Sequence, residues 1–248
     1  MAEANGIRVV LVMNRKGGSG KSTLVKGLAS AAVERGETVT VFDTDNSQST
    51  FQWMLNGKDK DRWSELGQVI HSLDENAIIE TIDSIREMPD QEHLVLIDTY
   101  GGASEAADAL ALESDIVIVP SGLSRSDVTE TTQTMLWRER LKERVDMPEA
   151  VPPAWIVINS IPLRRNEAEE AAIQHLLSTL PTLEEPVMRR AAYQRMDLEG
   201  LLGPIRDNIP NKAVAAHIVT ALEEMDAVLS EIDGIIKGIR QKQEDGDE

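Results

Sequence analysis

The sequence predicts an α/β protein whose doubly wound, mostly parallel sheet is covered by helices on both faces. Short apolar segments alternate along the 248 residues with longer segments of helical periodicity. The short segments are continuous apolar runs, as in parallel strands that are buried on both faces. A glycine-rich stretch joins the first strand to the first helix, which is a connection typical of phosphate-binding α/β proteins.

The expected elements follow in order from the apolar runs, the helical spacing and the stop signals. The predicted strands span residues 7–13, 38–42, 69–73, 93–97, 115–120 and 154–159. The predicted helices span residues 22–35, 75–88, 104–112, 124–145, 166–180 and 211–243. Gly36 ends the first helix, and Ser124 or Ser126 caps the fourth. Residues 181–210 form a mixed segment, and no helix is predicted within residues 43–68.

The composition is that of one globular domain with an aliphatic core. Apolar residues make up 41% of the chain, and no linker rich in Ser, Pro or Gly divides it. We therefore expect a single domain over residues 1–240, followed by an acidic, disordered tail at 241–248. The chain has no cysteine, which excludes disulfides and a carrier of metal clusters held by thiolates. The first residues do not resemble a signal peptide and no apolar run could cross a bilayer, so we expect a cytoplasmic protein.

Residues 14–23 read Asn-Arg-Lys-Gly-Gly-Ser-Gly-Lys-Ser-Thr and have the features of a phosphate-binding loop. Glycines allow successive backbone N–H groups to surround phosphate oxygens, and the following helix points its positive end at the same anion. Lys21 is placed to reach the β- and γ-phosphates, and the Ser22 hydroxyl is placed to bind Mg²⁺. Arg15 stands where the general pattern has glycine, and Lys16 is a second lysine at the start of the loop. The residues expected to contact the nucleotide are Gly17, Gly18, Ser19, Gly20, Lys21, Ser22 and Thr23.

Polar residues follow three of the predicted strands, at the edge where parallel sheets bind ligands. Asp98 follows the run His-Leu-Val-Leu-Ile, which predicts a Walker B aspartate that holds Mg²⁺ through a water molecule. Asp43 and Asp45 follow the second strand, and one of them can contact the loop or Mg²⁺ while the other orients the attacking water. The alternative is that both aspartates cap the next helix. Asn159 can hydrogen-bond an adenine edge or serve only as a turn residue.

Together these segments resemble the ParA/MinD family of P-loop ATPases. The deviant Walker A loop of that family is similar to residues 16–23, its second acidic motif to 43–45, its Walker B motif to 96–99 and its adenine-side asparagine to Asn159. The stretch Asp-Thr-Tyr-Gly-Gly at 98–102 is similar to Asp-Thr-His-Gly-Gly of VirC-type T-DNA transfer proteins. Many ParA proteins carry Pro-Gln-Gly after the paired aspartates and Pro-Pro-Gly after Walker B, and this chain has neither.

The resemblance implies a hydrolase of low intrinsic rate that binds ATP or ADP with Mg²⁺ and forms an ATP-dependent sandwich dimer. In that family the lysine matched by Lys16 crosses to the partner's nucleotide, where a cation neutralises charge in phosphoryl transfer. The expected catalytic residues are Lys16, Lys21, Asp43 and Asp45, and the expected metal-binding residues are Ser22 and Asp98. The family also implies a role in plasmid partition, conjugative transfer or the positioning of another cargo. A DNA-binding or adaptor protein would stimulate hydrolysis, and the ATP-bound protein would associate with the nucleoid.

The partner class depends on the surface of the last third of the chain. The net charge is −18, so binding of non-specific double-stranded DNA requires a local basic patch. The candidates for that patch are Arg164, Arg165, Arg189, Arg190, Arg195, Arg206 and Lys212. The last predicted helix carries isoleucines beside basic residues, but acidic residues follow it, so we expect it to pack on the domain and not on a membrane. The alternatives to a positioning ATPase are a MinD-like membrane-associated ATPase and a metabolic synthase or ligase on the same scaffold.

Overall fold

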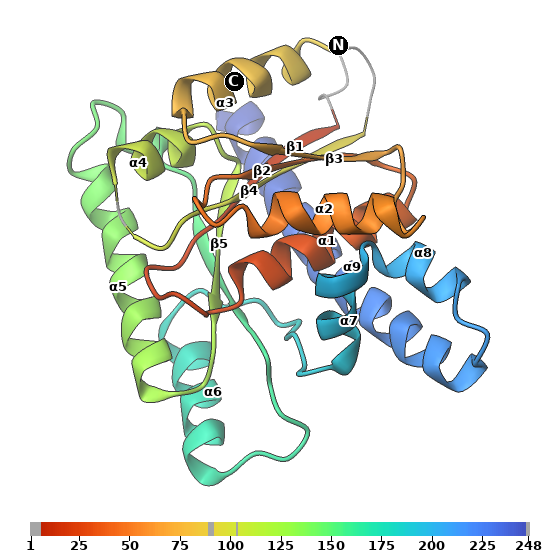
Figure 1. Cartoon of the computed structure of the whole chain (residues 1–248). Coiled ribbons are helices and arrows are strands. Elements are labelled where there is room, and N and C mark those ends of the chain that lie inside the picture. The colour runs from red at the N-terminus through yellow and green to blue at the C-terminus, as the bar shows by residue number, and fades with distance from the viewer. Residues whose placement is uncertain (1–5, 89–91, 103, 247–248) are drawn as a thin grey trace.

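The computed structural model describes residues 6–88, 92–102 and 104–246, and within them it contains one six-stranded sheet in which all strands are parallel (Figure 1). The strands are β1 (Ile7–Val12), β2 (Thr38–Asp43), β3 (Gly67–His71), β4 (His93–Asp98), β5 (Ile116–Ser121) and β6 (Ala154–Ile158). Their order is β3-β2-β4-β1-β5-β6, so β1 lies inside the sheet between β4 and β5. The predicted doubly wound parallel sheet is confirmed, and each of its six predicted strands is present.

Nine α-helices connect or follow these strands in the described part of the chain. They are α1 (Lys21–Glu34), α2 (Ser49–Asp59), α3 (Glu75–Arg86), α4 (Glu105–Leu112), α5 (Arg125–Lys142), α6 (Glu167–Thr179), α7 (Ala191–Glu199), α8 (Leu202–Asp207) and α9 (Lys212–Gly246). The six predicted helices are confirmed to within a few residues at each end. Ser124 is the cap of α5, as one of the two alternatives predicted, because its hydroxyl accepts the backbone N–H of Asp127.

The sequence analysis missed α2, which fills the segment between the second and third strands. The helix has no side-chain cap of its own, and its first-turn N–H groups at Thr50 and Phe51 donate to the carboxylate of Asp43. Trp53 anchors the helix, because its side chain is fully buried and its indole N–H donates to the carbonyl of Met196 at 2.9 Å. The Trp53 contact joins positions 143 residues apart, so the packing that stabilises α2 could not be read from the local sequence.

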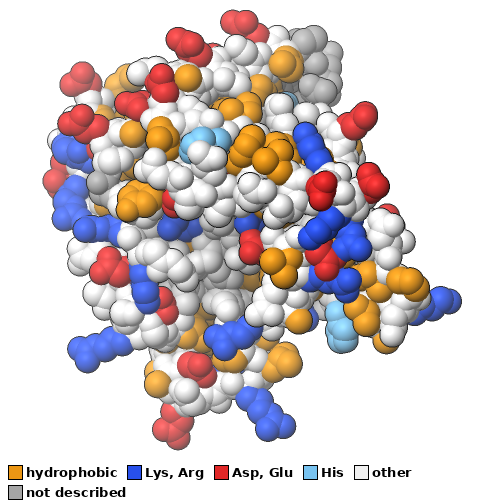
Figure 2. All heavy atoms as spheres, viewed as in Figure 1, with side chains coloured by type: hydrophobic (Ala, Val, Ile, Leu, Met, Phe, Trp, Pro, Cys, Tyr) orange, Lys and Arg blue, Asp and Glu red, His pale blue; other side chains and the backbone are white. Residues whose placement is uncertain are grey.

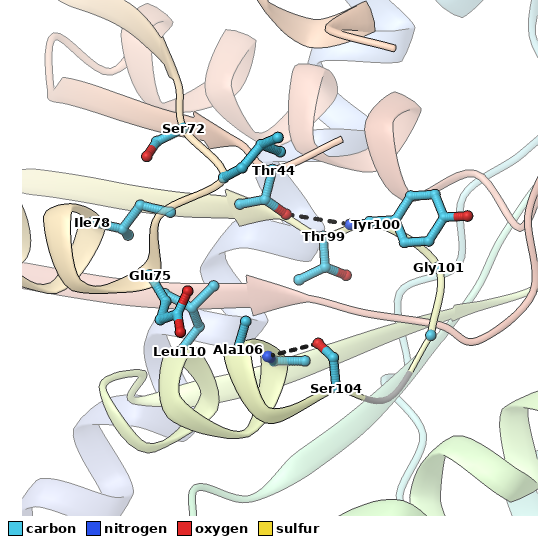
Figure 3. Close-up of a pocket in the computed structure, with 13 residues that line it drawn as sticks. Thr44, Ser72, Glu75, Ile78, Thr99, Tyr100, Gly101, Ser104, Ala106 and Leu110 are labelled. Carbon is cyan, nitrogen blue, oxygen red and sulfur yellow. Dashed lines mark hydrogen bonds between the residues drawn. The ribbon is translucent and has the colours of Figure 1, made fainter. Parts of the chain in front are cut away.

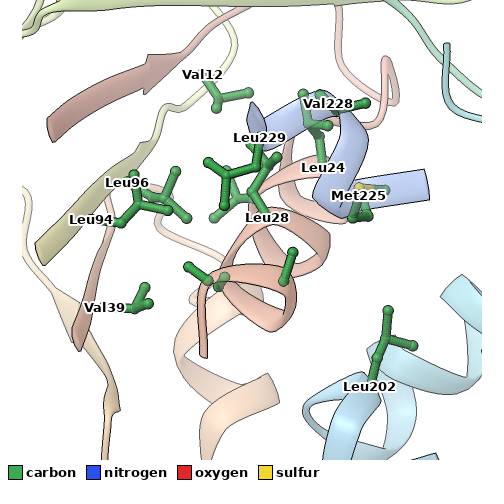
Figure 4. Close-up of a cluster of buried hydrophobic side chains, with 14 of the residues drawn as sticks. Val12, Leu24, Leu28, Val39, Leu94, Leu96, Leu202, Met225, Val228 and Leu229 are labelled. Atoms are coloured by element: carbon green, nitrogen blue, oxygen red, sulfur yellow. The ribbon is translucent and has the colours of Figure 1, made fainter. Parts of the chain in front are cut away.

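Each face of the sheet is covered by its own apolar cluster. Side chains of β1, β2 and β4 pack on one face against α1, α2 and the three C-terminal helices (Figure 4). On the other face, α3, α4, α5 and α6 pack against the alternate side chains of the same strands. The sheet is therefore rigid, and the carboxyl ends of all its strands meet at one edge.

The long helix α9 lies on α1, and ion pairs reinforce its apolar contacts. Asp233 accepts hydrogen bonds from Arg8 at 2.6 Å and from Arg35 at 2.8 Å, and Arg35 also pairs with Asp226. Ile232 and Ile236 are buried against the domain, as the sequence predicted. No described helix has the length and apolar character to span a membrane.

The C-terminal boundary differs from the prediction. A disordered tail was expected from residue 241, but α9 continues as a helix to Gly246. Buried apolar residues continue along this helix as far as Ile236, so the helix is already anchored on the domain before the acidic end begins. Residues 247 and 248 lie outside the described part of the chain.

Candidate nucleotide-binding site

The glycine-rich loop leaves the end of β1 and enters α1 directly. Its first residue, Asn14, is buried, and both polar atoms of its side-chain amide hold the loop. The nitrogen donates to the carbonyl of Pro120 at 2.8 Å, and the oxygen accepts the backbone N–H of Lys16 at 2.8 Å. Gly18 and Gly20 adopt left-handed conformations with φ of 78° and 91°. Glycine is needed there because other residues rarely adopt this region. Two glycines of the loop thus adopt backbone conformations that other residues rarely reach.

Lys21, the first residue of α1, is buried beneath this loop. Its ammonium lies 3.4 Å from the carbonyl of Lys16, so the side chain folds back along the loop. Burial lowers the pKa of Lys21, while the nearby carboxylates of Asp98 and Asp45 act in the opposite direction. The turn after β4 also reaches this point, since a Cβ atom on Gly101 would lie 3.6 Å from the Lys21 ammonium. A cation is thus held at the place where strand ends, loop and helix meet.

Asp98 is a buried acidic group at the end of β4. It is 2% exposed and accepts the Thr50 hydroxyl on Oδ2 at 2.7 Å. Burial raises the pKa of Asp98 to about 6, against the hydrogen bonds from Thr50 and Ser22 and the charge of Lys21. Its Oδ1 and the Oγ of Ser19 are buried without a hydrogen-bond partner among the described residues. One orphan acceptor beside a serine and one orphan hydroxyl donor in a glycine loop fit the Mg²⁺ and phosphate oxygens predicted for this site.

Asp43 and Asp45, whose roles the sequence could not distinguish, have different hydrogen-bond partners in the structure. Asp43 is fully buried, and both its oxygens accept backbone N–H groups: Asp45 on Oδ1, and Thr50 and Phe51 on Oδ2. This is the helix-capping alternative, so the contacts do not favour a catalytic role for Asp43. Asp45 is only partly buried, and the one hydrogen bond seen on its carboxylate is the Ser47 N–H on Oδ1 at 2.8 Å. Asp45 therefore keeps an oxygen available on the Lys21 side of the site.

Lys16 points toward its own α5 and away from the glycine loop. Its ammonium contacts Asp127 Oδ1 at 2.6 Å and the Ser126 hydroxyl at 2.7 Å. Burial opposes ionisation of Asp127, yet the hydrogen bonds from Lys16 and Ser124 hold the pKa of its carboxyl below the usual range. The side chain of Lys16 is about one-third exposed, so a modest rearrangement would free its ammonium.

A pocket of about 390 Å³ opens on the flank of the loop away from the aspartates. Asn159 forms part of it, and its side-chain nitrogen donates to the carbonyl of Ser19 at 3.1 Å. The approach is so close that a Cβ atom on Gly20 would overlap the amide of Asn159. The opposite wall of the pocket consists of Met188, Arg189, Arg190, Tyr193, Gln194 and Asp197. Asn159 is thus placed between the glycine loop and a wall that the sequence left as a mixed segment.

A second cavity, of about 360 Å³, lies beside the turn that follows β4 (Figure 3). The hydroxyl of Thr44 accepts the Tyr100 N–H at 3.3 Å, which ties the turn after β2 to the turn after β4. Tyr100 itself is 62% exposed at the rim. The cavity leaves one side of the turn at 99–102 unpacked, at the point closest to Lys21.

The basic residues proposed for DNA contact are mostly paired within the chain. Arg165 pairs with Glu170, Arg190 with Glu224, and Arg195 with Glu199. Arg206 likewise pairs with Glu34 and Asp207. Arg164, Arg189 and Lys212 are exposed and have no carboxylate partner among the described residues. In the view of Figure 2, Lys and Arg side chains are interspersed with Asp and Glu and do not form one continuous patch.

Thr50 and Asn14 are site residues that the sequence analysis did not identify. Thr50 is buried and holds Asp98, while Asn14 holds the loop. A polar residue directly after the apolar run of β1 was a usable signal for Asn14. Thr50 carried no such signal, because its contact with Asp98 depends on α2, which was itself not predicted.

The raised pKa of Asp98 predicts how the stability of the protein without nucleotide and Mg²⁺ depends on pH. Between pH 4 and 6 the folded state binds more protons than the unfolded state at this carboxyl, so its contribution to stability falls as pH rises. Asp98→Asn is therefore expected to raise the free energy of unfolding at pH 7.5 by ~1–3 kcal/mol. Denaturant titrations with EDTA at pH 5 and 7.5 measure the effect, which should be smaller at pH 5. A less stable variant at pH 7.5 would contradict the conclusion that burial of the ionised Asp98 carboxylate destabilises the folded protein.

Comparison with known proteins agrees with this geometry. The family model described as VirC1 protein matches residues 7–241. The protein virC1 of Rhizobium rhizogenes is 27% identical over 187 residues, which are 75% of this chain and 79% of that protein. The protein ParA of Rhizobium radiobacter is 25% identical over 208 residues, 84% of this chain and 90% of its own length. Among solved structures, the septum site-determining protein MinD of Pyrococcus horikoshii OT3, complexed with Mg-ADP, superposes with a TM-score of 0.60 at 19% identity, covering 93% of this chain and 98% of that one.

Proposed function

We propose that this chain, which belongs to the VirC1 protein family and is a ParA/MinD-like P-loop protein, binds ATP with Mg²⁺, hydrolyses it slowly and dimerises when ATP is bound. The observation that carries the proposal is the buried, unpartnered oxygen of Asp98 beside Lys21 and Ser22, under a loop with two left-handed glycines. A site of this kind is costly for a folded protein unless a cation and an anion fill it.

Each residue of the site has a role that follows from its position. The backbone N–H groups of residues 17–23 bind phosphate oxygens, and Lys21 neutralises the phosphate end of the nucleotide. Ser22 and Asp98 hold Mg²⁺, which supplies charge neutralisation at the phosphates when it is bound. Asp45 orients the attacking water, because its carboxylate keeps an oxygen available where that of Asp43 does not.

Dimerisation is proposed to use Lys16 as a cation supplied to the partner's site. The loop presents Lys16 at its outer face, and among the described residues its ammonium is held by Ser126 and Asp127 on the surface of α5. A lysine that leaves Asp127 for the phosphates of a second copy would make dimer formation depend on ATP.

The proposed cargo interaction is non-specific binding to double-stranded DNA, with plasmid partition or conjugative DNA transfer as the process served. Its support is limited to Arg164, Arg189 and Lys212, since the other candidates already neutralise carboxylates of the same chain. In the cell this activity would place the ATP-bound dimer on the nucleoid, with a DNA-binding or adaptor protein stimulating hydrolysis.

Arg164→Ala and Arg189→Ala are each expected to weaken DNA binding in the ATP state. The slope of log affinity against log salt should fall by about 1 for each variant, because each removes one phosphate contact. Arg165→Ala is the matched control, as it removes an arginine that is paired with Glu170. Fluorescence anisotropy with a labelled duplex at three salt concentrations measures these slopes. Equal slopes in all three variants would contradict the assignment of the patch.

The experiment that tests the proposed function is the ATPase rate with and without duplex DNA, together with ATP-dependent retention of the protein on DNA. Stimulation or retention supports a positioning ATPase. A protein that hydrolyses ATP only with a small organic acid or amine substrate would instead be the metabolic synthase or ligase of the same scaffold. Retention on anionic vesicles in place of DNA would support the MinD-like alternative.

A further inference from the structure

The wall of the pocket opposite the glycine loop combines residues 188–190, which lie outside the named helices and strands, with Tyr193, Gln194 and Asp197 of α7. Residues 183–190 connect the region after β6 to α7. Backbone hydrogen bonds of Leu183, Val187 and Arg189 with residues 156–161 hold this segment beside β6. Met188, Arg190 and Tyr193 are residues of this wall that also contact Glu224 of α9. Such a segment needs an additional fixed contact if it is to present a defined surface to a ligand.

One carboxylate of α9 supplies that contact. Glu224 Oε1 accepts the backbone N–H of Met188 at 2.9 Å and the phenol of Tyr193 at 2.6 Å. Its Oε2 accepts the guanidinium of Arg190, from Nε at 2.9 Å and from Nη2 at 2.7 Å. Burial and the charge of Glu224 both raise the pKa of Tyr193, so its phenol remains a donor. A single side chain thus holds three residues of the wall, and it is itself only 10% exposed.

The wall lies on the nucleoside side of the site. Asp45 and Asp98 are on the other flank of the loop, where phosphates and Mg²⁺ are expected, and neither of them lines this pocket. Thr23 and the three residues Gly18, Ser19 and Gly20 form the pocket's loop side, next to Asn159. A nucleotide whose phosphates lie in the loop would therefore extend its sugar and base against the segment that Glu224 holds.

We propose that Glu224 is a positioning residue for the nucleotide, and that it fixes the wall formed by Met188, Arg190 and Tyr193 against the sugar and base without touching them. The inference rests on the proposed nucleotide binding and adds that the C-terminal helix determines how tightly the nucleoside part is held. Because the contact lies away from the γ-phosphate, ATP and ADP depend on it equally. The hydrogen bonds to the Glu224 carboxylate are charge-assisted and therefore stronger than bonds between neutral groups, so their loss should lower the nucleotide affinity measurably.

Glu231, which follows Glu224 on α9, provides a matched control. Its two oxygens accept the backbone N–H groups of Glu184 at 2.9 Å and Glu185 at 3.0 Å, so it also clamps the connecting segment to α9. Neither Glu184 nor Glu185 lines the pocket. Loss of Glu231 therefore loosens the same connection without moving the wall.

The test measures affinities of the full-length protein for fluorescent ATP and ADP analogues, with thermal unfolding of the nucleotide-free protein alongside. Glu224→Ala is expected to weaken both nucleotides by about tenfold while Glu231→Ala changes either by less than about twofold. The effect should appear in KM and not in kcat at saturating ATP. Glu224→Gln, which keeps an acceptor for Met188 and Tyr193 but loses the charge facing Arg190, should give an intermediate value and serves if Glu224→Ala does not fold.

Three results would overturn the inference while leaving the proposed function intact. They are unchanged affinity in both Glu224 variants, an equal loss in Glu231→Ala, and a loss for ATP alone. Failure of the wild-type protein to bind either nucleotide would instead remove the proposed function and this inference together.

Discussion

Lys21→Ala is expected to abolish measurable ATP binding, with affinity at least ~100-fold weaker than that of the wild-type protein. Lys21 is the buried cation at the junction of loop, helix and strand ends, and its position leaves Asp98 and Asp45 facing it. Without the ammonium, the negative charge of the phosphates would lie beside the carboxylates of Asp98 and Asp45 with no Lys21 cation to neutralise it. Isothermal titration with Mg²⁺-ATP measures the loss.

The control for this variant is its own stability. The Lys21 ammonium makes one long hydrogen bond, of 3.4 Å to a carbonyl, and burial disfavours its charge. Lys21→Ala should therefore unfold at a temperature close to that of the nucleotide-free wild type, while losing the shift that ATP produces in the wild type. Normal ATP binding by a folded Lys21→Ala protein would contradict the assignment of the site.

Lys16→Ala is expected to leave ATP binding within about threefold of wild type. The same variant should reduce ATP-dependent dimerisation and lower the hydrolysis rate by about 100-fold or more, as the loss of a cation supplied in trans does. Binding is retained because the Lys16 ammonium contacts α5 and points away from the interior of its own loop. Nucleotide titration, light scattering and phosphate release together separate the three effects.

Asp127→Asn is the matched variant for Lys16→Ala. It removes the ion pair with Lys16, yet an asparagine can still accept the Ser124 N–H that caps α5. If Lys16 acts only through its ion pair within the chain, the two variants behave alike. If Lys16 acts on a partner, Asp127→Asn retains dimerisation and hydrolysis, and only Lys16→Ala loses them.

The sheet and the glycine loop could be predicted from the sequence because their signals are local. Continuous apolar runs define the strands, and the loop carries its glycines, lysines and serine within ten residues. The approach of Asp98 to Lys21 followed from the rule that ligands gather at the carboxyl ends of parallel strands.

What could not be predicted depends on contacts between distant segments. The roles of Asp43 and Asp45 diverge because α2 presents its N–H groups to Asp43. Helix α2 in turn packs through Trp53 on Met196, which lies 143 residues further along the chain. The pairing of Arg190 with Glu224 joins positions 34 residues apart and removes that arginine from the DNA-binding candidates. Helix α9 likewise extends to Gly246, and it is attached to the domain before its acidic end, for example by the ion pair between Arg35 and Asp233.

The central claim is that bound ATP makes this protein a dimer through Lys16. Multi-angle light scattering of the Asp45→Ala variant, in which slow hydrolysis preserves the ATP state, tests it most directly. The account predicts that the molar mass doubles with Mg²⁺-ATP, stays that of a monomer with Mg²⁺-ADP, and stays that of a monomer with ATP once Lys16→Ala is added. A protein that binds ATP but remains a monomer, or one that dimerises equally well without Lys16, would contradict the account.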